Sequence, residues 1–152
     1  MAIVSPNELK TIVPAGSCLL GLDFGSKTIG LAIADPTFLI ASPFRTIKRG
    51  KFLKDFNELE VVIDSQGIGG LVCGLPIGMD GSEGSRCQST RQFVKNFLSK
   101  RDIPVAFWDE RLSTIAVDRV LIGEVDMSRE RRKKVIDKVA AAYILQGALD
   151  SL

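Results

Sequence analysis

The sequence predicts an α/β fold in which helices flank a mixed five-stranded β-sheet. Short apolar runs at 18–24, 71–73 and 103–108 lack regular polar alternation, which is typical of strands covered on both faces. Other stretches place apolar residues three and four positions apart, which is the spacing of amphipathic helices. In chain order the predicted elements are β-β-β-α-β-α-β-α-α.

The N-terminal segment, residues 1–17, is expected to be an irregular arm. It contains two prolines and a glycine and shows neither a strand period nor a helix period. Residues 18–152 then form one domain, because a chain of 152 residues has the size of a single domain and contains no internal repeat or low-complexity segment.

The first half of this domain is predicted to be a meander of three strands and a helix. The strands are expected at about 18–24, 28–34 and 38–48. Short turns that contain glycine or proline separate them, which favours antiparallel pairing. Apolar residues at helical spacing then indicate a helix at 51–65, and glycines end it.

The second half alternates strands and helices. The expected elements are a strand at 71–73, a helix at 86–100, a strand at 103–108, a helix from Ser113 or Thr114 to about Gly123, and a last helix at 133–150. The loop at 74–85 is too rich in glycine to be regular. Both a mobile flap over a substrate and a plain connection between strand and helix remain open for it.

The composition indicates a soluble globular protein. Its hydrophobic content is 45% and its charged content is 25%, and both values are ordinary for that class. No apolar run approaches the roughly 18 residues of a membrane span. The N-terminus also lacks the basic and apolar regions of a secretory signal, so we expect a cytoplasmic protein without a membrane partner.

The pattern of cysteines and the absence of histidine limit the kinds of catalysis and of metal site that the sequence allows. Three cysteines without a CxxC motif indicate neither a disulfide framework nor a thiolate zinc site. The absence of histidine excludes Ser-His-Asp and Cys-His catalysis and histidine-ligated metals. Carboxylates, lysines, backbone amides and hard cations remain for demanding reactions.

Three acidic residues stand where the pattern predicts burial. Asp23 lies inside the first apolar run, although aspartate is depleted in strands and costly to bury unpaired. Glu110 comes just after the strand at 103–108. Asp137 shares the apolar stripe of the last helix, so it should face the sheet. Because open α/β sheets bind ligands beyond the carboxyl ends of their strands, we expect the three acids to meet there.

Each acid also has a purely structural interpretation. Asp23 is compatible with a turn residue before Gly25, and Glu110 with an ion-pair partner of Arg111. Asp137 is compatible with an acid that the helix dipole favours near a helix N-terminus.

Three adjacent carboxylates fit a metal-dependent reaction. They raise one another's pKa, and a divalent cation offsets that repulsion. Mg²⁺ and Mn²⁺ prefer oxygen ligands, and a pair of such ions can activate water and stabilise the leaving oxygen of a phosphodiester. We therefore predict hydrolysis of phosphodiester bonds with Mg²⁺ or Mn²⁺ as cofactor. The predicted catalytic and metal-binding residues are Asp23, Glu110 and Asp137.

Basic residues stand close to these acids in the sequence, as a substrate that carries phosphates would require. A basic run can also be only a solvated helix face, and both interpretations remain open for the cluster before Asp137. The predicted nucleic-acid-binding residues are Lys27, Arg86, Arg111, Arg131, Arg132 and Lys133.

Four segments resemble the YqgF (RuvX-like) family in order and spacing. They are GLDFGSKTIG at 21–30, GLP and MDG within 74–81, DERLST at 109–114, and Asp137 with the apolar residues that follow it. The resemblance covers about residues 18–150. It implies an RNase H-like fold, related to the RuvC Holliday-junction resolvases, and a nuclease that matures the 5′ end of small-subunit (16S) ribosomal RNA.

The resemblance places the acidic triad on Asp23, Glu110 and Asp137, the same three residues that the pattern selects. Many RNase H-like nucleases have a fourth acid. Asp109 is next to Glu110, but strand alternation points it to the opposite face, so the number of bound metals stays open.

Two other functions remain as alternatives. One is a resolvase of Holliday junctions or other branched DNA, and the other is a domain that binds RNA or ribosomal particles without cutting. An Asp-x-Gly turn also occurs in the actin, hsp70 and sugar-kinase superfamily, but those proteins need two such domains and 152 residues supply one. The expected partner is therefore a nucleic acid, and both a monomer and a homodimer remain open.

Overall fold

The computed structural model describes residues 3–112 and 129–152, and within the last helix it describes side chains from residue 136 onward. None of the helices in these ranges is long and apolar enough to cross a membrane. The elements are β1 (Ile3–Val4), α1 (Pro6–Ile12), β2 (Cys18–Phe24), β3 (Thr28–Ala34), β4 (Ala41–Lys48), α2 (Phe52–Gln66), β5 (Ile68–Leu75), α3 (Ser85–Leu98), β6 (Val105–Asp109), the 3-10 turn η1 (Glu110–Leu112) and α5 (Arg129–Asp150).

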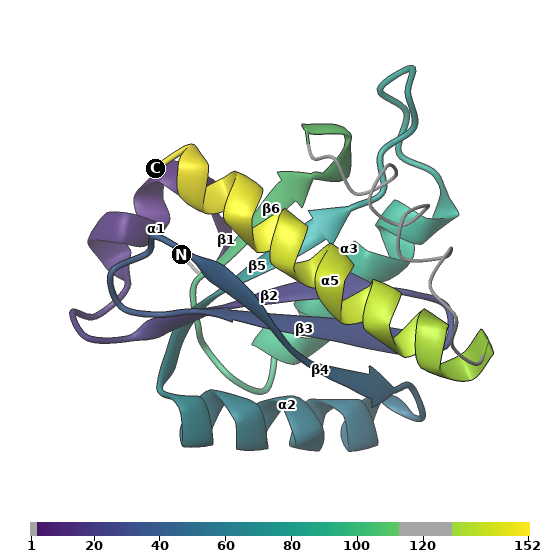
Figure 1. Ribbon diagram of the computed structural model, residues 1–152, viewed down its shortest axis with the longest axis horizontal. Coiled ribbons are helices and arrows are strands. Elements are labelled where there is room, and N and C mark those ends of the chain that lie inside the picture. The colour runs from purple at the N-terminus through teal and green to yellow at the C-terminus, as the bar shows by residue number, and fades with distance from the viewer. Residues whose placement is uncertain (1–2, 113–128) are drawn as a thin grey trace.

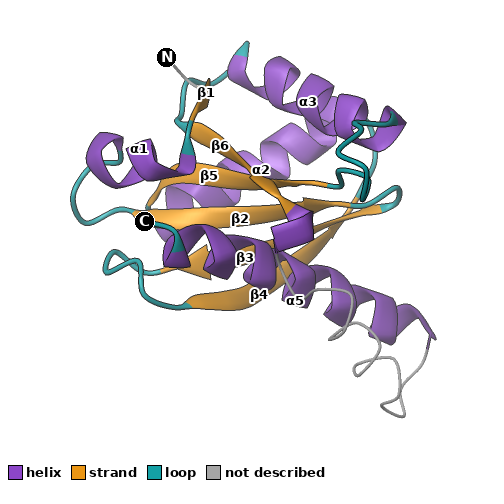
Figure 2. Cartoon of the chain, turned by 90° about the horizontal axis from the view of Figure 1, so that it is seen from above, coloured by secondary structure: helices purple, strands orange, loops and turns teal. Residues whose placement is uncertain are grey.

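The strands form one mixed sheet in the order β1-β6-β5-β2-β3-β4. The pairs β2–β3 and β3–β4 are antiparallel, whereas β2–β5, β5–β6 and β1–β6 are parallel. Helices α1 and α5 pack on one face of this sheet, and α2 and α3 pack on the other (Figures 1 and 2). The strand β2 is therefore central in the sheet and covered on both sides.

The predicted α/β class with a mixed sheet and flanking helices is confirmed, but the predicted number of strands is wrong. The sheet has six strands in the described part of the chain, because β1 pairs in parallel with β6 at one edge. The N-terminal arm is also not irregular, since it holds both β1 and α1. A strand of two residues is too short to leave a period in the sequence.

Helix α1 has physical reasons to form. Pro6 begins it, where a missing N–H costs nothing. Leu9 and Val13 are four residues apart and are both buried against the face that α5 covers. The helix predicted between residues 113 and 123 lies outside the described residues.

Candidate active site

Asp23 is a buried carboxylate on the central strand. Only 5% of its surface is exposed. Its neighbours on either side along the strand, Leu22 and Phe24, point into the core under α2 and α3. Because side chains alternate along a strand, Asp23 faces α5. Asp23 is still paired within the β2–β3 ladder, opposite Gly30, so it is a strand residue rather than a turn residue.

Glycines flank Asp23 on both neighbouring strands. Asp23 pairs with Gly30 on β3, and the pairing of Leu22 with Cys73 places Gly74 next in register on β5. Paired residues share a face, so both glycines also face α5. The sheet is therefore bare of side chains on each side of this carboxylate.

The other two acids lie above these glycines. A Cβ added at Gly30 would overlap the backbone carbonyl of Asp137. A Cβ added at Gly74 would stand 3.2 Å from Cγ of Glu110 and would also overlap Ile144 on α5. The structure thus brings the three predicted acids to the same face and the same end of the sheet, with Asp137 above Gly30 and Glu110 above Gly74.

Asp137 is held by the β2–β3 hairpin. The hydroxyl of Thr28, the first residue of β3, donates a hydrogen bond to Oδ2 of Asp137. Thr28 itself is buried, with only 9% of its surface exposed. This hydrogen bond attaches α5 to the end of the β2–β3 hairpin at Asp137, and the side chain of Asp137 points toward the sheet.

Glu110 begins the turn η1 directly after β6, and its neighbours form a separate ion pair. Nη2 of Arg111 lies 2.7 Å from Oδ2 of Asp109, and the Arg111 backbone N–H also donates to Asp109. These contacts hold the pKa of Asp109 below its ordinary value. Among the described residues, Arg111 thus forms an ion pair with Asp109.

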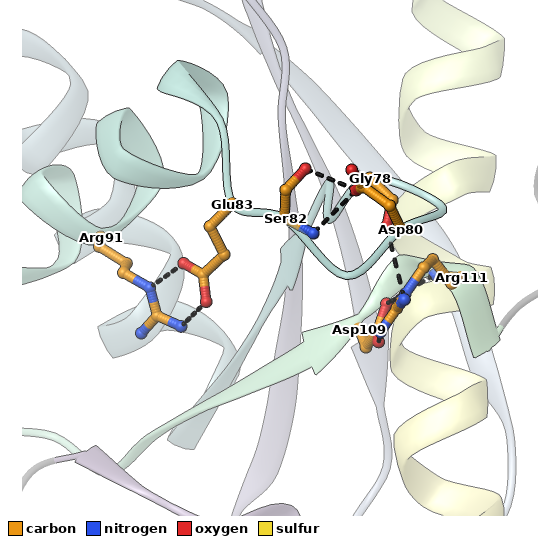
Figure 3. Close-up of polar contacts among 7 residues, drawn as sticks. All are labelled: Gly78, Asp80, Ser82, Glu83, Arg91, Asp109 and Arg111. Atoms are coloured by element: carbon orange, nitrogen blue, oxygen red, sulfur yellow. Dashed lines mark hydrogen bonds and ion pairs between the residues drawn. The ribbon is translucent and has the colours of Figure 1, made fainter.

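The same arginine reaches the loop between β5 and α3 (Figure 3). Nη1 of Arg111 donates to the carbonyl oxygen of Gly78 at 3.4 Å. Within the loop, Asp80 accepts hydrogen bonds from the hydroxyl and the backbone N–H of Ser82, and these bonds lower its pKa. Arg111, just after β6, therefore holds one side of the loop at 74–85. The sequence leaves open whether this loop is a mobile flap or a plain connection.

The other predicted basic residues have different surroundings. Lys27 is exposed in the turn between β2 and β3. Arg86 lies in the first turn of α3, and its Nη2 donates to the carbonyl oxygen of Phe24 at 3.4 Å. The side chains of Arg131, Arg132 and Lys133 lie outside the described part of the chain.

The arrangement suits a hard cation. Among the described residues, no three His, Cys, Asp or Glu side chains gather closely enough to hold an ion by themselves. Mg²⁺ does not need three, because it typically takes one or two protein carboxylates and completes its shell with water and substrate phosphate. The buried carboxylate of Asp23, with Glu110 and Asp137 on the same face of the sheet, offers carboxylate oxygens, which are the ligands that such an ion prefers, so the residues fit it.

The fold is of the α/β class with a mixed sheet, and the three acids lie on one face at the same end of this sheet. Residues 17–151 match the RuvX family, which is described as Holliday junction resolvase. A relative from Paramagnetospirillum magneticum is 58% identical over 99% of this chain and 97% of its own length. One from Rhodospirillum rubrum is 55% identical over 100% of this chain and 94% of its own. Both are provisionally named pre-16S rRNA nucleases. The chain belongs to the RuvX (YqgF) family.

Solved structures agree on the fold. The RuvC of T. thermophilus, in complex with a Holliday junction substrate, superposes with a TM-score of 0.56 at 12% identity and covers 89% of this chain and 94% of its own. The yeast mitochondrial Holliday junction resolvase Ydc2 gives 0.50 at 12% identity, over 95% and 82% of the two chains. At such low sequence identities the superpositions show a shared fold and say nothing about the roles of individual residues.

Proposed function

We propose that this protein is a metal-dependent endonuclease that hydrolyses phosphodiester bonds in precursor ribosomal RNA, at the maturation of the 5′ end of the small-subunit (16S) rRNA. The observation that supports it best is the buried Asp23 between Gly30 and Gly74, with Asp137 and Glu110 above these glycines. The names of the relatives, which match nearly the whole chain, favour the ribosomal substrate.

In this proposal Asp23, Glu110 and Asp137 would provide carboxylate oxygens for Mg²⁺ or Mn²⁺, with water and substrate phosphate completing the shell, and the ion would supply activation of water and stabilisation of the leaving oxygen. Asp23 is the fixed member, because strands on both sides hold its backbone. Thr28 orients the carboxylate of Asp137 through its hydroxyl, which donates to Oδ2 of that group. The glycines let α5 and Glu110 approach the sheet closely on either side of Asp23.

The second candidate is cleavage of branched DNA, and the RuvX match, described as Holliday junction resolvase, favours it. Both candidates use the same acids and differ only in the nucleic acid that reaches them. A binding domain without catalysis is the third possibility, and ribosomal particles would then be its partner. The proposal places the protein in the cytoplasm, where precursor rRNA is made.

One cleavage experiment separates these functions. The protein is incubated with Mg²⁺ and either an RNA that spans the 5′ boundary of 16S rRNA or a four-way DNA junction. We expect specific cleavage of the RNA, and a loss of several orders of magnitude in Asp23→Asn. Asp102→Asn is the matched control, because it makes the same chemical change at an exposed residue. Cleavage of the junction alone would favour the resolvase, and binding without cleavage of either would refute the nuclease.

The melting temperature of the same variants shows whether the fold survives. Removing one charge from a group of neighbouring acids relieves repulsion, so Asp23→Asn should melt no lower than the wild type without metal. A lower melting temperature with equal loss of activity would mean that Asp23 supports the structure rather than the reaction.

A further inference from the structure

A second feature of the molecule lies at the same end of β2, on the opposite face from Asp23. It is a pocket of about 610 Å³ between the β2–β3 turn, the β4–α2 turn and the first turns of α3. Phe24, the last residue of β2, forms part of its wall. The residues that give the pocket its polar character are Ser26, Arg49, Ser85, Arg86, Ser89 and Thr90.

The pocket is electropositive. Arg49 and Arg86 both line it, and no residue of its lining is acidic. In the described part of the chain neither arginine has a carboxylate within ion-pair distance, whereas Arg91, Arg101 and Arg111 each have one. Two uncompensated cations at one cavity repel each other and attract an anion.

The fold fixes Arg49 in place. Its Nη1 donates to the carbonyl oxygen of Gly25 at 2.7 Å, and its backbone N–H donates to the carbonyl oxygen of Lys27. The guanidinium also stands 6.0 Å from the ring centroid of Phe24 and 5.8 Å from that of Phe93. A guanidinium held by both contacts loses little freedom when it binds a ligand, and its remaining N–H groups suit phosphate oxygens.

Helix α3 adds donors to the same pocket. Its N-cap, Gly84, provides no side-chain acceptor for the first backbone N–H groups. Those groups and the helix dipole favour a negative charge beside Ser85. Ser89 and the buried Thr90 line the wall one turn further on, and both carry a hydroxyl group.

We propose that this pocket binds a phosphate group of the nucleic-acid strand that the acidic site cleaves, which makes it a positioning subsite. This step rests on the proposed function. Asp23 and Phe24 are consecutive residues that point to opposite faces of β2. A strand that passes around the end of β2 can therefore place one phosphate at Asp23 and another between Arg49 and Arg86. Such contacts set the register of the substrate without reading its sequence.

The test measures binding without cleavage. A labelled single-stranded RNA is titrated with the full chain in EDTA at several salt concentrations, and fluorescence anisotropy gives the affinity. Each lost phosphate contact should flatten the slope of log K against log salt by about 0.7. We expect that loss, with about a tenfold or larger fall in affinity, for Arg49→Gln and for Arg86→Gln. Arg45→Gln removes the same charge at an exposed position of β4 outside the pocket, so the slope of log K against log salt should stay that of the wild type.

A second pair of variants leaves the arginine contacts intact. Ser89→Glu introduces a negative charge into the pocket, whereas Gln88→Glu introduces it at the exposed neighbouring position on α3, which does not line the pocket. We expect weaker RNA binding for Ser89→Glu alone. Equal weakening by both, or an unchanged salt slope in Arg49→Gln and Arg86→Gln, would overturn the subsite.

Inorganic phosphate distinguishes the source of the ligand. If millimolar phosphate raises the melting temperature of the wild type but not of Ser89→Glu, and RNA binding is the same in both, the pocket takes a free anion and the proposal is wrong. Failure of the proposed function gives another result. If the wild type does not cleave RNA but Ser89→Glu weakens RNA binding, the proposed function fails and the phosphate subsite stands. If the wild type cleaves RNA and Ser89→Glu binds it normally, the phosphate subsite fails and the proposed function stands.

Discussion

Replacing Gly30 with alanine tests the geometry on which the candidate active site depends. The added Cβ would meet the backbone carbonyl of Asp137, and strand and helix would have to separate by roughly 1 Å to reach even a tight contact. The carbonyl belongs to the backbone of α5, so rotation of a side chain cannot relieve the overlap. Overpacking of this kind costs about 1–3 kcal/mol of unfolding free energy.

The expected results are therefore specific. For a chain of 152 residues the melting temperature should fall by roughly 2–12 °C. Displacement of Asp137 by about 1 Å should lower cleavage by about 100-fold, because misplacement on that scale is enough to disrupt a catalytic arrangement. Thermal unfolding followed by circular dichroism and cleavage of the precursor RNA measure the two effects on the same sample.

The control is Gly84→Ala, where the added Cβ would meet no atom within 4 Å. Its effect on stability should be less than about 1 kcal/mol, since alanine is only a poorer N-cap than glycine. If Gly30→Ala melts within a degree of the wild type and remains active, α5 does not pack on Gly30 and the described arrangement of Asp23 and Asp137 is wrong.

Three further predictions concern the metal, the basic cluster and the ion pair beside Glu110. Mg²⁺ or Mn²⁺ at 100 times its Kd should stabilise the wild type by about 2.7 kcal/mol and Asp23→Asn by less, and equal shifts in melting temperature would mean that the ion binds elsewhere. Replacing Arg131, Arg132 and Lys133 together with alanine should flatten the salt slope of RNA binding by roughly two units if these residues contact phosphates, and an unchanged slope would return them to a solvated helix face. The Asp109 carboxyl has a lowered pKa in the folded protein, so its pair with Arg111 stabilises the fold above the ordinary pKa of the group and is lost as the pH falls through the lowered value. Urea unfolding below about pH 4 should therefore lose less stability in Asp109→Asn than in the wild type, and parallel pH curves would contradict this.

The strands of the meander were predictable because their apolar runs are continuous. The expected bounds 18–24 and 28–34 are those of β2 and β3, and α2 differs from its prediction by one residue at each end. The predicted strand at 71–73 is only the middle of β5, which extends over Ile68–Leu75 because glycines at both of its ends hide the apolar pattern.

The contacts around the acids were not predictable from local patterns. Gly30 and Gly74 read as breaks in the sequence, but in the structure they are the positions where α5 and Glu110 come closest to the sheet. That closeness depends on packing between segments far apart in the chain. In the same way, Arg49 is 26 residues from Asp23 in sequence, and only the β3–β4 pairing brings it to the β2–β3 turn.

The end of β2 joins the two sites through strand alternation. Asp23 faces α5 and the other acids, whereas Phe24 faces α3 and forms part of the wall of the pocket that Arg49 and Arg86 line. Inserting or deleting one residue in β2 would exchange these directions, because a strand repeats every two residues. The hairpin that follows is tied to both sides, since Thr28 donates to Asp137 on one and Gly25 accepts from Arg49 on the other. If the two proposals hold, a substrate that contacts both sites is aligned by this one hairpin, which sets the separation between the cleaved bond and the anchoring phosphate.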